Sequence, residues 1–467
     1  MKRAAVALID GEHYPPVVVE ALRETSERFE YRAALFLGGT EKIRTADLAG
    51  EAERIYGLPV VFDQDWCRGL AAAIEKYHPE VIVDLSDEPV VGYEQRFRLI
   101  SHALARNVGY EGSDFHFSPS NPVRLSNCPS LSIVGTAKRV GKTAVSGFVA
   151  RVLQEGAGGV AGSPGVVIVA MGRGGPERPE VIDGLGTELG SERLLTWSRE
   201  GRHAASDHFE DAVLSRVITV GCRRCGGGMA GAPFVSNVAE GALVANDLHP
   251  EMVIFEGSGA SLPPVGTDCR LLVAGAHQPV EYLTGYLGTY RVLVSDSVVL
   301  AMAEEPLATA AKVRALIEGV AAVKPGIPVI PVVLRPKPAR PIEGKRVAFF
   351  STAPDVQKGL LRWYLAERWG CRVELVSTNL ADRGALLRDL QRPEMDRVDV
   401  MATEIKAAAI DVVAAEAARR GVELVFVDNE PLEVPPAERG ELREEACRLS
   451  RLARQRFKAQ MGSHECF

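Results

Sequence analysis

The sequence predicts an α/β fold built from three units, each with a mainly parallel sheet. Short apolar runs rich in Val, Ile and Leu alternate with helical patterns along most of the chain, which is typical of parallel strands covered by helices. The length of 467 residues suggests about three domains. Apolar residues make up 46% of the chain and charged residues 25%, so each third can bury its own core.

The charge and hydropathy of the chain exclude several classes of partner. The formal net charge is −7, so no global basic surface for nucleic acid is expected, and a strongly anionic ligand needs a local basic pocket. The apolar run near the N-terminus is interrupted from Asp10 to His13, as in a strand that ends in a loop rather than a signal peptide. No segment approaches the roughly 18 apolar residues of a membrane span, and we expect a cytoplasmic protein.

Residues 1–125 are expected to form a Rossmann-like α/β domain. The stretches AAVALID, AALFLGG, PVVFDQ and EVIVDLSD read as its strands. Because open parallel sheets bind ligands at the carboxyl ends of their strands, His13 and its neighbours are candidates for contact with a substrate. His13 has three candidate roles: binding phosphate, acting as an acid, or only forming a hydrogen bond within its loop.

Residues 126–338 are expected to form a nucleotide-binding domain around the loop GTAKRVGKT. The usual phosphate loop has four residues between its glycines; this loop has five, so Thr136 stands where the first glycine is expected. A strand precedes the loop and a helix follows it, which presents backbone N–H groups to phosphate. The residues predicted to bind the nucleotide are Gly135, Thr136, Val140, Gly141, Lys142, Thr143 and Ala144.

Three of the side chains in this domain suggest magnesium-dependent phosphoryl chemistry. Lys142 would reach the β- and γ-phosphates, and the Thr143 hydroxyl would bind Mg²⁺. Glu256 ends the buried strand of MVIFEGSGASLPPV, a suitable place for a second metal ligand. The alternative for Glu256 is that it only caps a loop.

Two glycine-rich loops carry arginines suited to an anionic substrate. Arg173 and Arg178 follow the strand GVVIVAMG, and Arg223 and Arg224 lie in GCRRCGGGMAGAPF. Glycine lets the backbone approach a ligand closely, and arginine binds phosphate in a bidentate manner. We predict that all four bind substrate and that Arg173 acts with Lys142 in catalysis; the alternatives are a solvated basic loop and a flexible turn.

Cys222 and Cys225 form one CxxC pair within the second of these loops. A second pair at zinc-ribbon spacing is missing, so ordinary thiols are favoured over structural zinc.

The last part of the chain is expected to form a third α/β unit, residues 345–434, and a helical tail, residues 435–467. The stretch RPKPARPIEGK is predicted to be a stiff linker before this unit. Glu404 and Lys406, in MATEIKAAAIDVVAAEAARRG, are predicted to lie on a helix surface. The tail is rich in Glu and Arg and is predicted to be a solvated helix.

Together, these stretches resemble a known family. GTAKRVGKT and MVIFEGSGASLPPV resemble the dethiobiotin synthetase group of P-loop enzymes. With IDGEHYPPVV, FLGGTEK, VAMGRGGPERPE and ATEIKAAAIDV, the chain is similar over nearly its whole length to the cyclic 2,3-diphosphoglycerate synthetases. The resemblance implies an ATP-dependent ligase that closes 2,3-diphosphoglycerate into a ring through an intramolecular phosphoanhydride and releases ADP and phosphate.

The resemblance also implies Mg²⁺, K⁺ as a further candidate cation, and a homodimer. Two other functions share the nucleotide motifs. One is a dethiobiotin-synthetase-like ligase that activates a carboxylate. The other is a P-loop nucleotide switch or metal chaperone, for which the CxxC pair is the only support.

Overall fold

The computed structural model divides the chain into two compact units, and each is described by itself. The described residues are 1–39, 41–42, 50–120, 122–156, 164–185, 190–201 and 207–464. The first unit consists of Met1–Asn121, Pro279–Val294 and Gly319–Pro325; the second consists of Pro122–Gln278, Ser295–Glu318 and Gly326–Phe467. The predicted α/β class is confirmed in both.

The first unit contains a six-stranded sheet in the order β3-β2-β1-β4-β5-β6. The chain order reverses between β1 and β4, as in one half of a Rossmann sheet, and only β6 is antiparallel to its neighbour. The strands are β1 (Arg3–Ile9), β2 (Phe29–Phe36), β3 (Val60–Phe62), β4 (Val81–Asp84), β5 (Gly109–Glu111) and β6 (His116–Phe117).

The segment Pro279–Val294 also belongs to this unit and packs on helix α5 (Tyr93–Leu104). The ring of Tyr286 meets that of Phe97 edge-on, with centroids 5.5 Å apart, and Ser101 Oγ donates to the Tyr286 carbonyl oxygen at 3.2 Å. The helices of the unit are α1 (Pro15–Glu24), η1 (Thr25–Glu27), α3 (Ala52–Tyr56), α4 (Trp66–Tyr77), α5 (Tyr93–Leu104), α10 (Glu281–Thr284) and α11 (Gly288–Leu293).

The second unit is built on a 13-stranded sheet in the order β11-β10-β8-β12-β7-β13-β14-β15-β19-β18-β16-β17, with β9 also paired to β10. Strands β10 to β15 of this order run parallel. Its strands are β7 (Ser130–Gly135), β8 (Val166–Gly172), β9 (Glu180–Ile182), β10 (Ile218–Cys225), β11 (Val235–Ser236), β12 (Met252–Glu256), β13 (Cys269–Gly275), β14 (Ser297–Ala301), β15 (Val329–Pro338), β16 (Arg346–Phe350), β17 (Arg372–Ser377), β18 (Val400–Thr403) and β19 (Glu423–Glu433).

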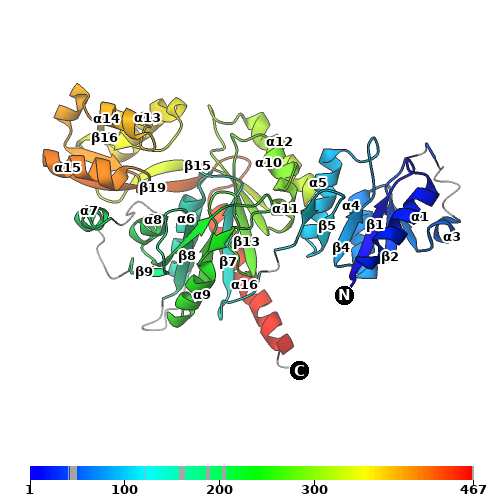
Figure 1. The fold of residues 1–467 in the computed structure, drawn as a ribbon. Helices are drawn as coiled ribbons and strands as arrows, with labels where there is room; N and C mark the ends of the chain where they lie inside the picture. The colour runs from blue at the N-terminus through cyan, green and yellow to red at the C-terminus, as the bar shows by residue number, and fades with distance from the viewer. Residues whose placement is uncertain are drawn as a thin grey trace. The chain divides into compact units, whose positions relative to one another are not determined.

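Helices cover both faces of this sheet. Alternate strand residues divide between two cores: Ile168 packs in the cluster that contains α6, and Val167 and Val169 pack in the cluster that contains α9 (Figure 1). The helical segments are α6 (Lys142–Gly156), α7 (Ser191–Arg199), α8 (Asp207–Glu210), η2 (Asp211–Ser215), α9 (Val238–Asp247), α12 (Ala310–Val323), η3 (Asp355–Gln357), α13 (Lys358–Trp369), α14 (Arg383–Asp389), η4 (Pro393–Arg397), η5 (Ala409–Ala414), α15 (Ala415–Arg420) and α16 (Glu441–His464).

The predicted linker at RPKPARPIEGK is wrong for its first residues. Strand β15 continues to Pro338 and pairs antiparallel with β19, with Arg335 opposite Glu430 and Lys337 opposite Asp428. Pro336 and Pro338 are two residues apart, so both missing N–H groups lie on the same side of the strand and the other side stays free to pair. The nucleotide-binding strands and the C-terminal strands therefore form one continuous sheet.

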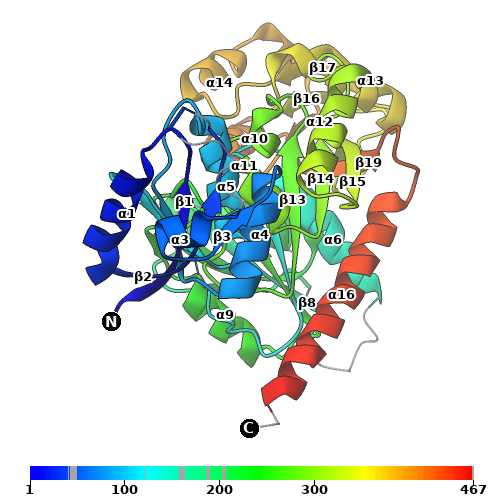
Figure 2. The same ribbon diagram turned by 90° about the vertical axis from the view of Figure 1, so that its right-hand side faces the viewer.

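The composition of the tail predicted a solvated helix, but one side of this helix is buried. Four residues at helical spacing, Leu442, Ala446, Leu449 and Ala453, are fully buried in the core that also contains the phosphate-loop strand β7. Figure 2 shows α16 running beside α6. The many Glu and Arg residues conceal one apolar stripe, which is enough to fix a helix on a core.

None of the helices in the described part of the chain is long and apolar enough to span a membrane.

Candidate functional site

The phosphate loop joins β7 to α6, which begins at Lys142. Gly141 has a φ of +89°, and a Cβ there would lie 2.9 Å from Leu334 Cδ1, so both its conformation and its surroundings require glycine. A Cβ on Gly135 would lie 2.7 Å from Lys142 Cδ. Glycine at position 135 therefore lets the lysine side chain fold back over the end of the strand.

Thr136, which replaces the expected glycine, is fixed to the neighbouring strand. Its backbone N–H donates to the Val273 carbonyl oxygen at 3.1 Å. Its hydroxyl donates to Gln278 Oε1 at 2.5 Å. The loop is thus held at Thr136 by β13 and by Gln278, which follows that strand.

Lys142 is buried, and burial lowers the pKa of its ammonium group. The carboxylates of Glu256 and Asp207 act in the opposite direction, whereas the cations Lys406 and Arg173 lower this pKa further. The ammonium group of Lys142 therefore has both acidic and basic side chains around it.

Glu256 and Asp211 form a pair of buried carboxyl groups beside Thr143. Glu256 ends β12 and is 2% exposed, and Asp211 begins η2 and is 0% exposed. Burial, and then Asp207, raise the pKa of Glu256 to about 7. Burial, and then Glu256, raise the pKa of Asp211 well above its usual range. Two carboxyl groups this close either share a proton or hold a cation between them.

None of the four oxygens of this pair has a hydrogen-bond partner of normal geometry among the described residues. A buried carboxyl oxygen without a partner is costly, which suggests that a ligand satisfies it. Oxygen donors suit Mg²⁺, which keeps several waters and takes one or two carboxylates plus phosphate oxygens. Within the same residues no group of three or more His, Cys, Asp or Glu is arranged to hold a metal ion, so the Thr143 hydroxyl and a nucleotide would complete such a site.

Arg173 and Arg224 converge on the loop that follows Glu256. Gly259 has a φ of +59°, and a Cβ there would lie 2.8 Å from one terminal nitrogen of Arg173 and 3.3 Å from one of Arg224. Arg224 donates to the carbonyl oxygens of Gly226 and Ser258, at 2.5 and 2.8 Å. Burial, and then Arg173, lower the pKa of Arg224. The structure thus brings two guanidinium groups together at the same edge of the sheet as Glu256.

Arg178 and Arg223 do not join this pair. Both are exposed, and neither is among the main charges that shift the pKa of Lys142, Glu256 or Arg224. On β10, Arg223 and Arg224 are adjacent, so their side chains lie on opposite faces of the strand, and only Arg224 is buried.

His13 belongs to the first unit, at the carboxyl end of β1. Its Nδ1 lies 2.9 Å from Asp10 Oδ1, and its backbone N–H donates to the same oxygen at 3.1 Å. Asp10 is fully buried and also accepts from the Asp87 N–H at 2.8 Å. The His13 loop is therefore firmly held at the rim of its own sheet. Thr40, within the stretch FLGGTEK, lies outside the described residues.

Three acidic residues near the phosphate loop were missed by the sequence analysis: Asp207, Glu210 and Asp211. They lie on α8 and the start of η2. Asp207 Oδ2 would lie 3.9 Å from a Cβ on Gly172, at the end of β8. The available signal was the stretch SDHFEDAV, which places acids three and four residues apart, on one face of a helix.

The prediction that Glu404 and Lys406 lie on a helix surface is wrong. Both follow β18 in a loop, and η5 begins only at Ala409. Glu404 is 4% exposed, and Lys406 Nζ lies 3.1 Å from Glu210 Oε1. The apolar run that looked helical begins as a buried strand, and its two charged residues sit where that strand ends.

The CxxC pair is not arranged as a metal site. Cys222 is fully buried, whereas Cys225 is exposed. Burial raises the pKa of the Cys222 thiol to about 12, so the thiolate that a metal requires is disfavoured.

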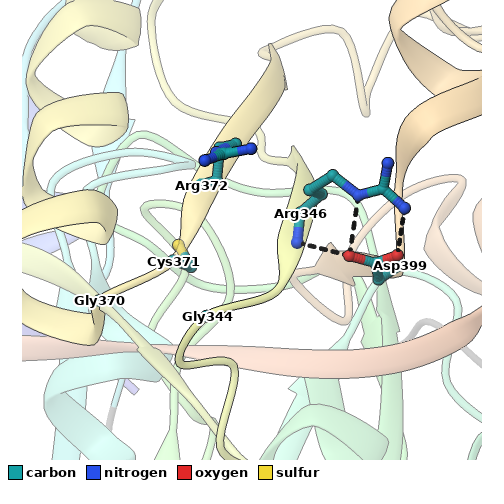
Figure 3. Close-up of a pocket in the computed structure, with 6 residues that line it drawn as sticks. All are labelled: Gly344, Arg346, Gly370, Cys371, Arg372 and Asp399. Carbon is teal, nitrogen blue, oxygen red and sulfur yellow. Dashed lines mark hydrogen bonds and ion pairs between the residues drawn. The ribbon is translucent and has the colours of Figure 1, made fainter.

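A surface pocket of about 570 Å³ lies elsewhere in the second unit, and Figure 3 shows the six residues that line it. Arg346 and Arg372 begin β16 and β17, so the pocket is at the amino ends of these strands. Arg346 pairs with Asp399 at 2.7 Å. Since ligands of open α/β sheets bind at the carboxyl ends, we do not assign it to the site.

Models of three domains match this chain in order. They are described as the N-terminal domain (residues 4–118), the P-loop domain (residues 130–333) and the C-terminal domain (residues 338–430) of cyclic 2,3-diphosphoglycerate synthetase.

Curated relatives carry the same name. The cyclic 2,3-diphosphoglycerate synthetase of Rubrobacter xylanophilus is 52% identical over 428 residues, covering 91% of this chain and 93% of the relative. That of Methanothermus fervidus is 42% identical over 433 residues, covering 91% and 92%. Among solved structures, the crystal structure of HypB from Helicobacter pylori in complex with nickel is 15% identical, and the match covers 44% of this chain and 79% of that chain. Its TM-score is 0.26, which is too low to indicate a shared fold.

Proposed function

Because this chain belongs to the cyclic 2,3-diphosphoglycerate synthetase family, we propose that it closes 2,3-diphosphoglycerate into its cyclic form at the expense of ATP. The product is an intramolecular phosphoanhydride, and ADP and phosphate are released. The observation that carries the proposal is the match of all three domains, in order, to that family. The phosphate loop, the carboxyl pair and the arginine pair supply suitable chemistry.

The chemical difficulty of the reaction is charge. Two phosphate groups of one molecule repel each other and do not condense without activation. We propose that an oxygen of one substrate phosphate attacks the γ-phosphorus of ATP and that the bond to ADP breaks. An oxygen of the neighbouring phosphate then attacks the activated substrate phosphorus, the ring P–O–P bond forms, and inorganic phosphate leaves. No general base is required, since both attacking oxygens are already ionised.

The protein would contribute mainly by stabilising negative charge, as is usual in phosphoryl transfer. Lys142 would bind the transferred phosphoryl group. Thr143, Glu256 and Asp211 would hold Mg²⁺, which neutralises charge on the β- and γ-phosphates when bound. The carboxyl pair supports this role, because a divalent cation would satisfy four oxygens that lack hydrogen bonds of normal geometry among the described residues.

Arg173 and Arg224 would bind the acid substrate beside the γ-phosphate. Their convergence at Gly259 supports this role, because two guanidinium groups repel each other unless an anion lies near both. His13, Arg178 and Arg223 remain proposed substrate contacts on sequence grounds. A homodimer, K⁺ as a further cation and a cytoplasmic location also remain proposals, and they rest on the sequence and the family resemblance.

The direct test is to incubate the protein with ATP, Mg²⁺ and 2,3-diphosphoglycerate and follow the phosphorus NMR spectrum. We expect resonances of a ring anhydride together with ADP and inorganic phosphate in equal amounts. A second incubation starts from 2-phosphoglycerate instead. If it yields only the linear diphosphate, the protein is a kinase. ATP turnover with a carboxylate substrate alone would favour the dethiobiotin-synthetase-like alternative.

Lys142→Ala should abolish turnover, with a loss of about 10³-fold or more in kcat, because the transferred phosphoryl group loses its cation. Thermal unfolding checks that the variant is folded. Lys337→Ala is the control, because its ion pair with Glu430 lies on the β15–β19 ribbon. Normal cyclisation by Lys142→Ala would contradict the assignment.

A further inference from the structure

Lys406 brings a cation from the C-terminal strands to the nucleotide-binding part of the same sheet. It follows β18 and pairs with Glu210 of α8 at 3.1 Å. The Lys406 side chain is 30% exposed, so solvent reaches part of it, although burial acts on its ammonium group. Because an ammonium group has three N–H donors and the contact with Glu210 uses one, it can also bind a ligand.

Two acidic side chains stabilise this cation: Glu404, and Glu210, whose own pKa burial raises to about 8 although Lys406 opposes the shift. Glu404 accepts hydrogen bonds from Ser351 Oγ, Thr352 N, Thr352 Oγ1 and Asn429 Nδ2, each at 2.9 Å. Burial acts to raise the pKa of the Glu404 carboxyl, but Lys406 and then these donors outweigh it and hold the pKa below its usual range. Burial alone would lower the pKa of Lys406, but Glu210 and Glu404 outweigh it. The lysine is therefore a permanent cation.

Lys406 also lies in the field of the phosphate loop. Its ion-pair partner Glu210 directly precedes Asp211, the carboxyl group beside Glu256, and α8 packs on β8, which ends just before Arg173. Lys406 therefore adds a fourth cation to Lys142, Arg173 and Arg224 around the carboxyl ends of β7, β8, β10 and β18, and like charges repel. Such repulsion is unfavourable in the free protein and is relieved when an anion binds among them.

The backbone next to Lys406 is strained. Ala407 has a φ of +49°, a left-handed conformation that non-glycine residues rarely adopt. Strain of this kind persists where the surrounding structure enforces it, and it clusters at ligand-binding sites. Here the left-handed conformation of Ala407 sets the path of the backbone immediately after Lys406.

We propose that Lys406 binds a phosphate group of the acid substrate, and that Glu210 and Glu404 hold its ammonium group in position for this contact. The inference rests on the proposed function and assigns the C-terminal part of the chain a role in that site. A substrate with two phosphate groups needs two cationic subsites; Arg173 with Arg224 supplies one, and Lys406 supplies the other.

The experiment measures the binding of two ligands by calorimetry to wild-type protein and to Lys406→Met. One titration adds a non-hydrolysable ATP analogue with Mg²⁺. The other adds 2,3-diphosphoglycerate to protein already saturated with that analogue. Lys337→Met is the matched control, because it removes a lysine–glutamate ion pair of the same unit outside the site.

We expect Lys406→Met to weaken binding of the acid about tenfold or more while affinity for the nucleotide analogue stays within about twofold. Lys406→Arg should restore most of the affinity for the acid, because it restores a cation. Unchanged binding of the acid by Lys406→Met would overturn the proposal. An equal loss for both ligands would also overturn it, since Lys406 would then act only by holding α8.

Removing one partner of a buried ion pair can prevent folding. The double variant Lys406→Met with Glu210→Gln removes both members of the ion pair, and Glu404 keeps its four hydrogen-bond donors. The test stays decisive, because this variant should fold and still lose affinity for the acid. Failure of this inference is separate from failure of the proposed function. Wild-type protein that forms the ring anhydride establishes the function, whatever the lysine variants bind.

Discussion

Two buried carboxylates of the second unit, Glu256 and Glu404, differ in what surrounds them. Glu256 ends β12 and is 2% exposed, and neither of its oxygens accepts a hydrogen bond of normal geometry among the described residues, although Asp211 and Thr143 lie beside it. Glu404 follows β18, is 4% exposed, and accepts four hydrogen bonds. The pKa of Glu256 is raised to about 7, whereas the pKa of Glu404 is lowered.

Burial alone therefore does not decide what a carboxylate does; the charges and the donors around it do, Lys406 and four donors for Glu404 and the acid Asp207 for Glu256. A carboxylate with four donors is stable without any ligand and can serve as a fixed structural anion. A carboxylate with none is unfavourable in the free protein and becomes favourable when a cation binds. The comparison assigns Glu256 to ligand binding and Glu404 to support, and three experiments can test it.

The largest expected effect is on turnover. Glu256→Gln should lower kcat roughly 10²- to 10³-fold, because a metal ligand is lost, while the melting temperature should not fall, since a costly buried charge is removed. Steady-state kinetics measure kcat, and thermal unfolding measures the melting temperature. A variant that loses stability but keeps its activity would reverse the assignment.

The second effect is on stability. Glu404→Gln should lower the free energy of unfolding by about 1.5–3 kcal/mol, because the amide nitrogen would face donors that the carboxylate accepted. Its affinity for Mg²⁺ and nucleotide should stay within about twofold. Denaturant unfolding measures the first quantity, and Glu430→Gln, on the exposed pair with Lys337, should cost less than about 1 kcal/mol. An equal loss in both variants would mean that the four donors contribute little.

The third effect is a dependence of stability on pH, which is gradual and has opposite signs at the two sites. The folded pKa of Glu256 is raised, from 4.5 to about 7, so the folded state binds more protons in that window and stability falls as pH rises, by at most about 1.4 kcal/mol per unit. The folded pKa of Glu404 is lowered, so its contribution is present above pH 4.5 and is lost as pH falls below it.

Unfolding of metal-free protein between pH 4 and 8 measures these slopes. Glu256→Gln should flatten the fall between pH 4.5 and 7, and saturating Mg²⁺ with nucleotide should flatten it in the wild type. The same slope in Glu256→Gln would show that the carboxyl pair is not its source.

The sequence alone determined much of this protein. The alternation of short apolar runs and helical patterns established the α/β class, since periodicity and length distinguish buried strands from helices locally. The loop GTAKRVGKT between a strand and a helix established the nucleotide-binding character. The order of the motifs established the family. Each of these features is encoded in neighbouring residues.

Only the tertiary structure decided which distant residues meet. Glu256 lies beside Asp211 because η2 packs on α6 and α8 packs on β8, the neighbour of β12 in the sheet. Lys406 reaches Glu210 because β15 and β19 join the C-terminal strands to the nucleotide-binding sheet. The same applies to the stripe of α16 that is buried against that sheet. Strand order is a choice among long-range pairings of similar local sequence, and local periodicity does not encode it.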